Sequence, residues 1–133
     1  ESRGQVVGVI GTPIDQYYPP ENKLMQDEIA KYHLLISQVP FYRYSIEPFK
    51  SKKYYFPQRN ETMSALSEAT IIVEASDTSG TLTQARAAIQ QGRKLFILNS
   101  CFENPNIKWP RTFEERGAIR VRHIEEILSH LKV

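Results

Sequence analysis

A short polar run, Asp77-Thr78-Ser79-Gly80-Thr81, contains residue types suited to holding an anion. Gly80 removes the side chain that would block close approach, and the hydroxyls of Ser79 and Thr81 add donors to the free N–H groups at the start of the helix that follows. Phosphate is the anion that helix N-termini commonly bind. The run therefore predicts a phosphate-binding loop.

Two further features could contact a phosphate or a base. Gly11 and Thr12 follow the first strand-like run, where a glycine either admits a phosphate or forms a tight turn, and both readings stay open. Arg59 could clamp a phosphate through two N–H groups, while Asn60 could read a base edge or cap its own helix. None of these runs is a Walker P-loop or a GxGxxG fingerprint, so nothing here points to ATP hydrolysis or hydride transfer.

Residues 38–58 mix basic and aromatic side chains and show no clear period, which predicts an extended loop. The rings are Phe41, Tyr42, Tyr44, Phe49, Tyr54, Tyr55 and Phe56. Single-strand binders combine such rings with cations and gain about 1–3 kcal/mol per stacked base. Rings in a loop also pin it to the core, and this alternative stays open for each ring. The expected nucleic-acid contacts are Arg43, Lys50, Lys52, Lys53 and Phe56.

The other reactive side chains form no recognisable site. His33, His123 and His130 lie far apart and match no metal-ligand spacing. Cys101 has no general base at motif spacing, which argues against a catalytic thiol. We expect no metal and no cofactor.

The elements that position these residues follow from hydrophobic patterning. Runs of β-branched residues alternate with helix-length amphipathic stretches, which predicts an α/β fold, a Rossmann-like three-layer sandwich with a mainly parallel sheet of about five strands. The expected strands are residues 6–10, 34–37, 70–75, 95–98 and 118–121. The expected helices are residues 23–32, 59–67, 81–91, 112–116 and a terminal helix. The inward stripe expected for the first of them is Leu24, Met25, Glu28 or Ile29, and Tyr32. Because parallel strands send their carboxyl ends to one edge, the three phosphate-binding features should be near neighbours.

Length and composition suit one domain over residues 1–133. The net charge of +2 is small, so any affinity for nucleic acid must come from local clusters of charge. A single cysteine and the lack of an apolar run of about 20 residues predict a cytoplasmic protein with no membrane partner. The chain begins with Glu1, which suggests a domain excised from a longer protein.

Several runs together carry a family resemblance. They are Phe56-Pro57-Gln58-Arg59-Asn60, Ala65-Leu66-Ser67, Ile72-Val73-Glu74-Ala75 and Ser79-Gly80-Thr81-Leu82-Thr83-Gln84-Ala85. In this order and spacing, the chain resembles the DprA/Smf DNA-processing family of the Rossmann-like SLOG superfamily over residues 6–100. The resemblance implies binding of single-stranded DNA, loading of a recombinase during DNA-mediated transformation, a homodimer and no catalytic turnover. It also implies a DNA phosphate pocket lined by Arg59, Asn60, Ser79, Gly80 and Thr81.

The chain departs from the family pattern at three points. The family's first strand-loop-helix units, with a glycine-serine-arginine phosphate site, are absent from these residues. Glu61 stands where the family tends to have a basic residue, and Asn99-Ser100-Cys101 replaces its proline-glycine turn.

Two alternatives come from the wider superfamily. One is a domain that senses a nucleotide ligand within a larger, defence-related protein. The other is a phosphoribohydrolase similar to the cytokinin-activating enzymes, which is disfavoured because Gln84 occupies the place of their catalytic glutamate. An amide cannot accept the proton or supply the charge that this hydrolysis requires, and Glu74 is the only nearby substitute.

Overall fold

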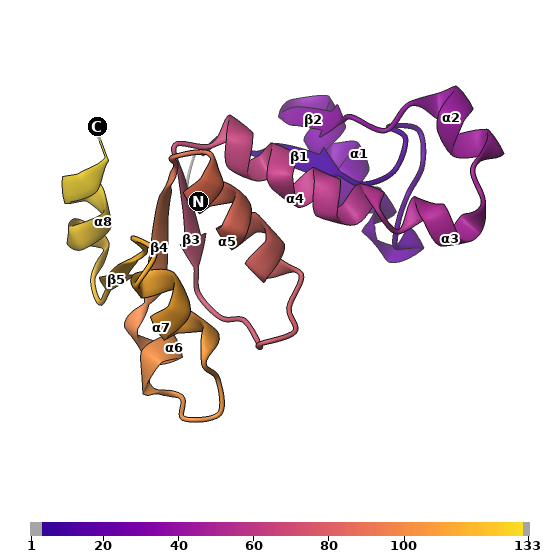
Figure 1. Cartoon of the computed structure of the whole chain (residues 1–133). Helices are drawn as coiled ribbons and strands as arrows, with labels where there is room; N and C mark the ends of the chain where they lie inside the picture. The colour runs from indigo at the N-terminus through magenta and orange to yellow at the C-terminus, as the bar shows by residue number, and fades with distance from the viewer. Residues whose placement is uncertain (1–3, 132–133) are drawn as a thin grey trace. The chain divides into compact units, whose positions relative to one another are not determined.

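The computed structural model describes residues 4–131, which form helices and parallel strands (Figure 1). These residues divide into two compact units, the first ending at Arg59 and the second beginning at Asn60. The predicted parallel α/β class is confirmed, and the five strands form one two-stranded and one three-stranded sheet. The assignment of the whole chain to one domain stays a prediction.

In the first unit, β1 (Val7–Ile10) pairs in parallel with β2 (Leu34–Ser37). The short 3₁₀ helix η1 (Pro20–Asn22) and helix α1 (Lys23–Tyr32) connect the two strands. A Cβ built at Gly8 would lie 3.2 Å from Ile29 Cγ2, so this glycine lets α1 pack closely on β1.

Helix α1 has the predicted bounds but does not bury the predicted stripe. Leu24, Met25 and Tyr32 are exposed, because a two-stranded sheet offers α1 only a narrow surface. The buried position is Gln26, whose Nε2 donates to the carbonyl of Gln16 at 3.0 Å. Its role is to hold the loop that precedes α1.

The expectation of an extended loop over residues 38–58 is wrong. Helices α2 (Phe41–Ile46) and α3 (Phe49–Lys52) lie there, and α4 (Tyr55–Leu66) begins before the segment ends. Pro40 and Pro48 have extended backbone at the N-caps of α2 and α3, where a missing N–H costs no intrahelical bond. Helices of six and four residues are too short to display a helical period.

In the second unit, β3 (Ala69–Ile72), β4 (Lys94–Leu98) and β5 (Ile119–Val121) form a parallel sheet in the order β3-β4-β5. The helices of this unit that follow α4 are α5 (Thr81–Gln90), α6 (Asn99–Glu103), α7 (Trp109–Glu114) and α8 (Ile124–His130). No pattern in the sequence predicts α6, which begins directly after β4.

Helices cover both faces of this sheet, as the three-layer prediction requires (Figure 1). Leu95 and Ile97 of β4 face a core built with α5, α6 and α7, whereas Phe96 between them faces α8. This alternation is the period of two that a strand imposes. The larger core consists of Ile72, Leu82, Ala85, Ala88, Leu95, Ile97, Cys101, Trp109, Phe113 and Ala118. No helix within residues 4–131 is long and apolar enough to span a membrane.

Candidate functional site

The loop between β3 and α5 ends in the predicted phosphate-binding residues. Gly80 is the N-cap of α5 and has an ordinary helical backbone, with φ −59° and ψ −21°. The nearest atom to a Cβ built at Gly80 would be Asn60 Nδ2, at 3.9 Å. Neither the backbone nor the packing of the described residues therefore requires glycine here. The missing side chain leaves the N-terminus of α5 open to close approach by a ligand.

Asn60 fastens this loop. Its Nδ2 donates a hydrogen bond of 3.0 Å to the carbonyl oxygen of Gly80, which ties the start of α5 to α4 within the second unit. The expectation that Asn60 caps its own helix is wrong, because α4 begins at Tyr55 and Asn60 lies within it. A contact of Asn60 with a base edge stays a prediction, and the bond to Gly80 is the role that the structure shows.

The loop itself uses most of the first N–H groups of α5. Ser79 Oγ accepts from the Thr81 N–H at 3.2 Å, and the N–H groups of Leu82 and Thr83 donate to the carbonyls of Ser79 and Gly80. Among the hydrogen bonds of the described residues, none uses the N–H of Gly80. The donors that remain for an anion are therefore the N–H of Gly80 and the hydroxyls of Ser79 and Thr81.

Gly11, directly after β1, is a glycine for a different reason. A Cβ built there would lie 2.8 Å from Cδ1 of Phe56, which is closer than two such carbons can approach. The Phe56 ring also contacts the Tyr18 ring, with centroids 5.4 Å apart. Packing therefore accounts for Gly11 and Phe56, and a contact of either with phosphate or nucleic acid stays a prediction.

Thr12 is buried in the turn after β1. Its Oγ1 donates to the carbonyl of Gln16 at 3.4 Å, and its own carbonyl accepts from Ser37 Oγ at 2.5 Å. These bonds join the turn to the end of β2. A phosphate contact by Thr12 stays a prediction.

Arg59 is partly buried in the first unit. Its Nη1 donates to the carbonyl of Val9 in β1 at 3.4 Å. Burial lowers the pKa of Arg59 from its usual value, although an arginine stays protonated at neutral pH. Because a partly desolvated cation is less screened by water, it interacts with an anion more strongly than an exposed one does.

The structure joins these features in two groups. Arg59 reaches β1 in the first unit, and Asn60 reaches the Gly80 loop in the second, from consecutive positions in α4. That Gly11-Thr12, Arg59-Asn60 and residues 77–81 lie at one edge of a sheet stays a prediction.

The predicted cations near α2 and α3 differ in their surroundings. Arg43 Nε donates to Glu47 Oε1 at 2.6 Å, and this bond lowers the pKa of Glu47. The charge of Arg43 is thus balanced within its own helix turn. Lys52 Nζ lies 4.3 Å from the centre of the Tyr44 ring, and Lys50 is exposed.

Lys53 is the last of the predicted cations and lies beside a ring as well. Its Nζ is 5.4 Å from the centre of the exposed Tyr54 ring. All four cations lie in or next to α2 and α3, which places them within one short stretch of the first unit.

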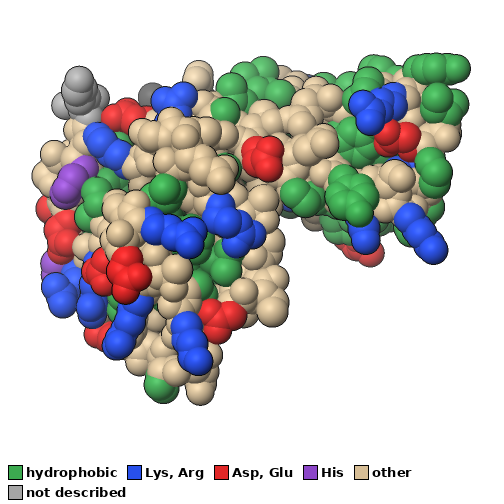
Figure 2. All heavy atoms as spheres, in the orientation of Figure 1, with side chains coloured by type: hydrophobic (Ala, Val, Ile, Leu, Met, Phe, Trp, Pro, Cys, Tyr) green, Lys and Arg blue, Asp and Glu red, His purple; other side chains and the backbone are tan. Residues whose placement is uncertain are grey.

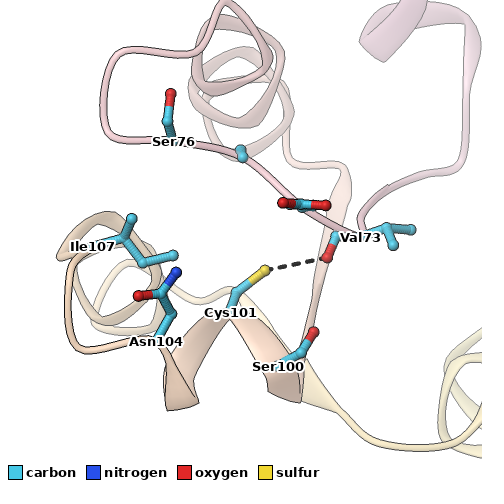
Figure 3. Close-up of a pocket in the computed structure, with 8 residues that line it drawn as sticks. Val73, Ser76, Ser100, Cys101, Asn104 and Ile107 are labelled. Atoms are coloured by element: carbon cyan, nitrogen blue, oxygen red, sulfur yellow. Dashed lines mark hydrogen bonds between the residues drawn. The ribbon is translucent and has the colours of Figure 1, made fainter.

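A pocket of about 390 Å³ lies at the carboxyl ends of β3 and β4 in the second unit (Figure 3). Its polar lining is Glu74, Ser76, Ser100 and Asn104, and its apolar lining is Val73, Ala75, Cys101 and Ile107. Small-molecule sites typically occupy about 300–1,000 Å³ and favour this end of a parallel sheet. Ser100 and Asn104 were not among the predicted site residues, because no motif in the sequence predicts α6. Ser100 lies in α6, and Asn104 follows its last residue.

Two residues that bear on catalysis have structural partners. Gln84 Nε2 donates to Thr70 Oγ1 at 3.4 Å, so its amide packs toward β3. The buried thiol of Cys101 donates to the carbonyl of Val73 at 3.3 Å (Figure 3). Burial, with the nearby charge of Glu74, raises the pKa of this thiol and so disfavours the nucleophilic thiolate.

Asp77, the first residue of the polar run, has a structural role. Its Oδ1 accepts from the backbone N–H groups of Lys108 and Trp109 at 3.0 and 3.1 Å. The carboxylate therefore holds the start of α7 and is engaged by the protein itself.

The family model described as DNA recombination-mediator protein A matches residues 1–132 of this chain. The DNA processing protein DprA of Bacillus subtilis (strain 168) is 33% identical over 131 residues, which are 98% of this chain and 42% of the relative. Protein Smf of Escherichia coli (strain K12) is 33% identical over 130 residues, which are 97% of this chain and 33% of the relative. The chain spans less than half the length of these relatives.

Solved structures agree with these sequence matches. The X-ray structure of DprA from Streptococcus pneumoniae has a TM-score of 0.79 and 29% identity, covering 98% of this chain and 44% of the other. DNA processing protein A from Helicobacter pylori, whose structure concerns its single-stranded DNA binding mode, has a TM-score of 0.71 and 27% identity, covering 92% and 54%. Because the family model matches nearly every residue and the folds agree, the chain belongs to the DprA/Smf family of DNA-processing proteins.

Proposed function

We propose that this chain binds single-stranded DNA and that Ser79, Gly80 and Thr81 contact a backbone phosphate. The names of its relatives support a role in DNA processing, and the Helicobacter pylori protein is a family member with a single-stranded DNA binding mode. The proposed phosphate contact follows the pocket that the family resemblance implies at these residues. It uses the Gly80 N–H and the hydroxyls of Ser79 and Thr81 as donors.

Gly80 carries the proposal. Its backbone would accept any residue, and a Cβ would have no neighbour closer than 3.9 Å, so the protein gains nothing from a glycine at this position. Close approach of a ligand to the backbone is the remaining reason for a glycine. The bond from Asn60 to the Gly80 carbonyl holds the loop in place before DNA arrives.

Positive charge in the first unit supports the same function. Arg59 is partly desolvated, and Lys50, Lys52 and Lys53 lie in or beside α3. Cations of this kind neutralise phosphates and release counterions, which makes affinity fall as salt rises.

The test is fluorescence anisotropy of a labelled oligothymidine over a salt series, with wild type, Gly80→Val and Arg59→Ala. A hydrogen bond to a charged group is worth about 1.5–3 kcal/mol. We therefore expect Gly80→Val to weaken binding by about tenfold or more, at about 1.4 kcal/mol per factor of ten.

Gly4→Val is the matched control, because a Cβ at Gly4 meets nothing within 4 Å and Gly4 lies outside the loop. This variant should bind as the wild type does. Thermal unfolding of each variant separates a lost contact from a lost fold. The proposal would be contradicted by an affinity for oligothymidine that does not change with salt, or by a Gly80→Val variant that binds as tightly as the wild type.

A broader role is proposed together with DNA binding. The two units would act as one Rossmann-type domain of a cytoplasmic homodimer that loads a recombinase during DNA-mediated transformation. The domain would work without catalytic turnover, in keeping with the engaged amide of Gln84 and the buried thiol of Cys101. Release of free base from nucleoside monophosphates would contradict this.

A small nucleotide ligand is the second candidate, and the pocket of about 390 Å³ favours it. The pocket offers the carboxylate of Glu74 and the amide of Asn104 as polar partners. In that case alanine at Lys50, Lys52 and Lys53 should leave nucleotide affinity unchanged, whereas it should weaken the binding of DNA. Calorimetric titration with nucleoside monophosphates distinguishes the two.

A further inference from the structure

Helices α2 and α3 form a folded platform. Val39 before α2 and Tyr55 after α3 are buried, and the rings of Tyr44 and Tyr55 pack together with centroids 5.8 Å apart. The platform is thus anchored at both ends of residues 40–54. Side chains that point away from these anchors are presented on short helices, which fix their directions better than a flexible loop would.

Four rings of the platform lie on its exposed surface. Phe49 is 89% exposed and Tyr42 is 77% exposed, and Phe41 and Tyr54 are more than half exposed. In the described part of the chain, no ring or cation contact involves Phe41, Tyr42 or Phe49. Large apolar rings left in water forgo the stabilisation of burial, so a cluster of them marks an interaction surface.

Basic residues occupy the same short segment as these rings. Four basic residues stand against Glu47 alone between Phe41 and Tyr54, and Glu47 is already paired with Arg43. Figure 2 shows blue basic and green hydrophobic side chains side by side over the part of the molecule that holds α2 and α3. The surface is therefore aromatic and positively charged at once.

We propose that this platform is a base-stacking surface that takes unpaired nucleotides, with Phe49 and Tyr42 as stacking rings and Lys50, Lys52 and Lys53 on the phosphates. The proposal rests on the single-stranded DNA binding proposed above. It adds a second contact type, because the Gly80 loop would hold a phosphate whereas the platform requires exposed bases.

Two other occupants fit the surface less well. A membrane-binding helix places Leu, Phe or Trp along one continuous face, whereas residues 41–56 contain no Leu and no Trp and are split into two short helices. A second copy of the chain would bring like charges together. Polyanionic single strands satisfy the charge and the rings together.

The experiment compares two labelled probes of equal length, an oligothymidine and an abasic oligonucleotide that keeps the phosphates but lacks bases. We expect the full chain to bind oligothymidine at least about fivefold more tightly than the abasic probe. The double variant Tyr42→Ala, Phe49→Ala should lose this preference and retain its affinity for the abasic probe. Phe49→Trp should keep the preference, whereas Phe49→Leu should lose part of it.

Tyr32→Ala is the matched control, since Tyr32 is an exposed ring of the same unit outside the platform. It should leave both affinities unchanged. Circular dichroism melts should show that the double variant folds, as expected for exposed side chains.

The outcomes separate the two proposals. Gly80→Val weakens both probes if the phosphate contact is correct, whatever the platform does. Equal binding of both probes by the wild type, or a double variant that keeps its preference for bases, would overturn the stacking surface. Binding to phosphatidylserine vesicles that depends on Phe49, without any base preference, would overturn it in favour of a membrane.

Discussion

Gly11 and Gly80 look alike in the sequence, since each lies in the segment that follows a parallel strand, yet their surroundings are opposite. A Cβ at Gly11 would collide with the Phe56 ring at 2.8 Å, whereas a Cβ at Gly80 would have its nearest neighbour at 3.9 Å. Gly11 is explained by the protein's own packing, and Gly80 is not. A glycine after a strand indicates a ligand only where the protein leaves the position of its Cβ empty.

The same contrast separates two cations of the first unit. Arg43 is held by Glu47 at 2.6 Å, whereas Lys50 is exposed and has no ion pair within residues 4–131. A charge that the protein already balances has less to offer a phosphate. Four sets of variants test how these glycines and cations differ.

Gly11→Ala should have the largest effect on stability. The added Cβ overpacks the space filled by Phe56, and overpacking costs about 1–3 kcal/mol. Urea unfolding measures the loss of unfolding free energy. Phe56→Leu combined with Gly11→Ala should show coupling between the two sites. If Gly11→Ala is neutral, Gly11 and Gly80 do not differ in the way proposed.

Asn60→Ala should have the next largest effect, because it removes the 3.0 Å bond to the Gly80 carbonyl. Loss of such a bond costs about 0.5–1.5 kcal/mol of unfolding free energy. Affinity for oligothymidine should fall with it, since the loop is no longer held. Asn60→Asp keeps the size of the side chain but cannot donate, so it should behave like Asn60→Ala; wild-type stability in both variants would show that the bond does not hold the loop.

Gly80→Ala should raise the free energy of unfolding by about 0.4–1 kcal/mol, because φ −59° suits alanine and the unfolded chain loses freedom. Gly92→Ala is its counterpart, since φ +67° at Gly92 is strained for any residue with a Cβ. Thermal unfolding of the two variants should therefore shift in opposite directions. A destabilised Gly80→Ala would mean that the fold itself requires this glycine.

The smallest expected effect is the difference between Lys50→Ala and Arg43→Ala in the salt dependence of their affinity for DNA. Each phosphate contact on a single strand contributes about 0.7 to the slope of log affinity against log salt. Lys50→Ala should reduce the slope by about that amount. Arg43→Ala should reduce it less, because Glu47 already balances the charge. Equal slopes for the two variants would remove the contrast between cations.

Local patterns in the sequence were sufficient for several elements. The bounds of α1 (Lys23–Tyr32) and β2 (Leu34–Ser37) match the prediction, and α5 begins at Thr81 as predicted. Gly92 follows α5 with the positive φ that a helix end favours. These features depend on hydrophobic period and on single residues with strong backbone preferences, which act over a few positions.

Prediction from the sequence failed for helices of only a few residues and for burial that depends on a neighbouring element. Helices α2 and α3 are too short to show a period, and Pro40 and Pro48 could be read as loop residues although they precede helices. The signal was weak, because proline is favoured at the first position within a helix, whereas Pro40 and Pro48 occupy the N-cap before it. The predicted stripe on α1 is mostly exposed because the sheet beside this helix has only two strands. A hydrophobic pattern within α1 carries no information about the width of that sheet.

Hydrophobic period and motif spacing were sufficient to predict the parallel α/β class, the family and the residues whose types suit phosphate binding. Which of these residues the protein already uses depends on contacts between distant parts of the chain. The carbonyl that accepts from Arg59 belongs to Val9, 50 residues away, and Asn60 bonds to Gly80 over 20 residues. Local propensity acts between neighbours in the chain, whereas packing and hydrogen bonding depend on distance in space. For this reason Gly11 and Gly80 are the same residue type in similar sequence positions, but only Gly80 leaves space for a ligand beside its backbone.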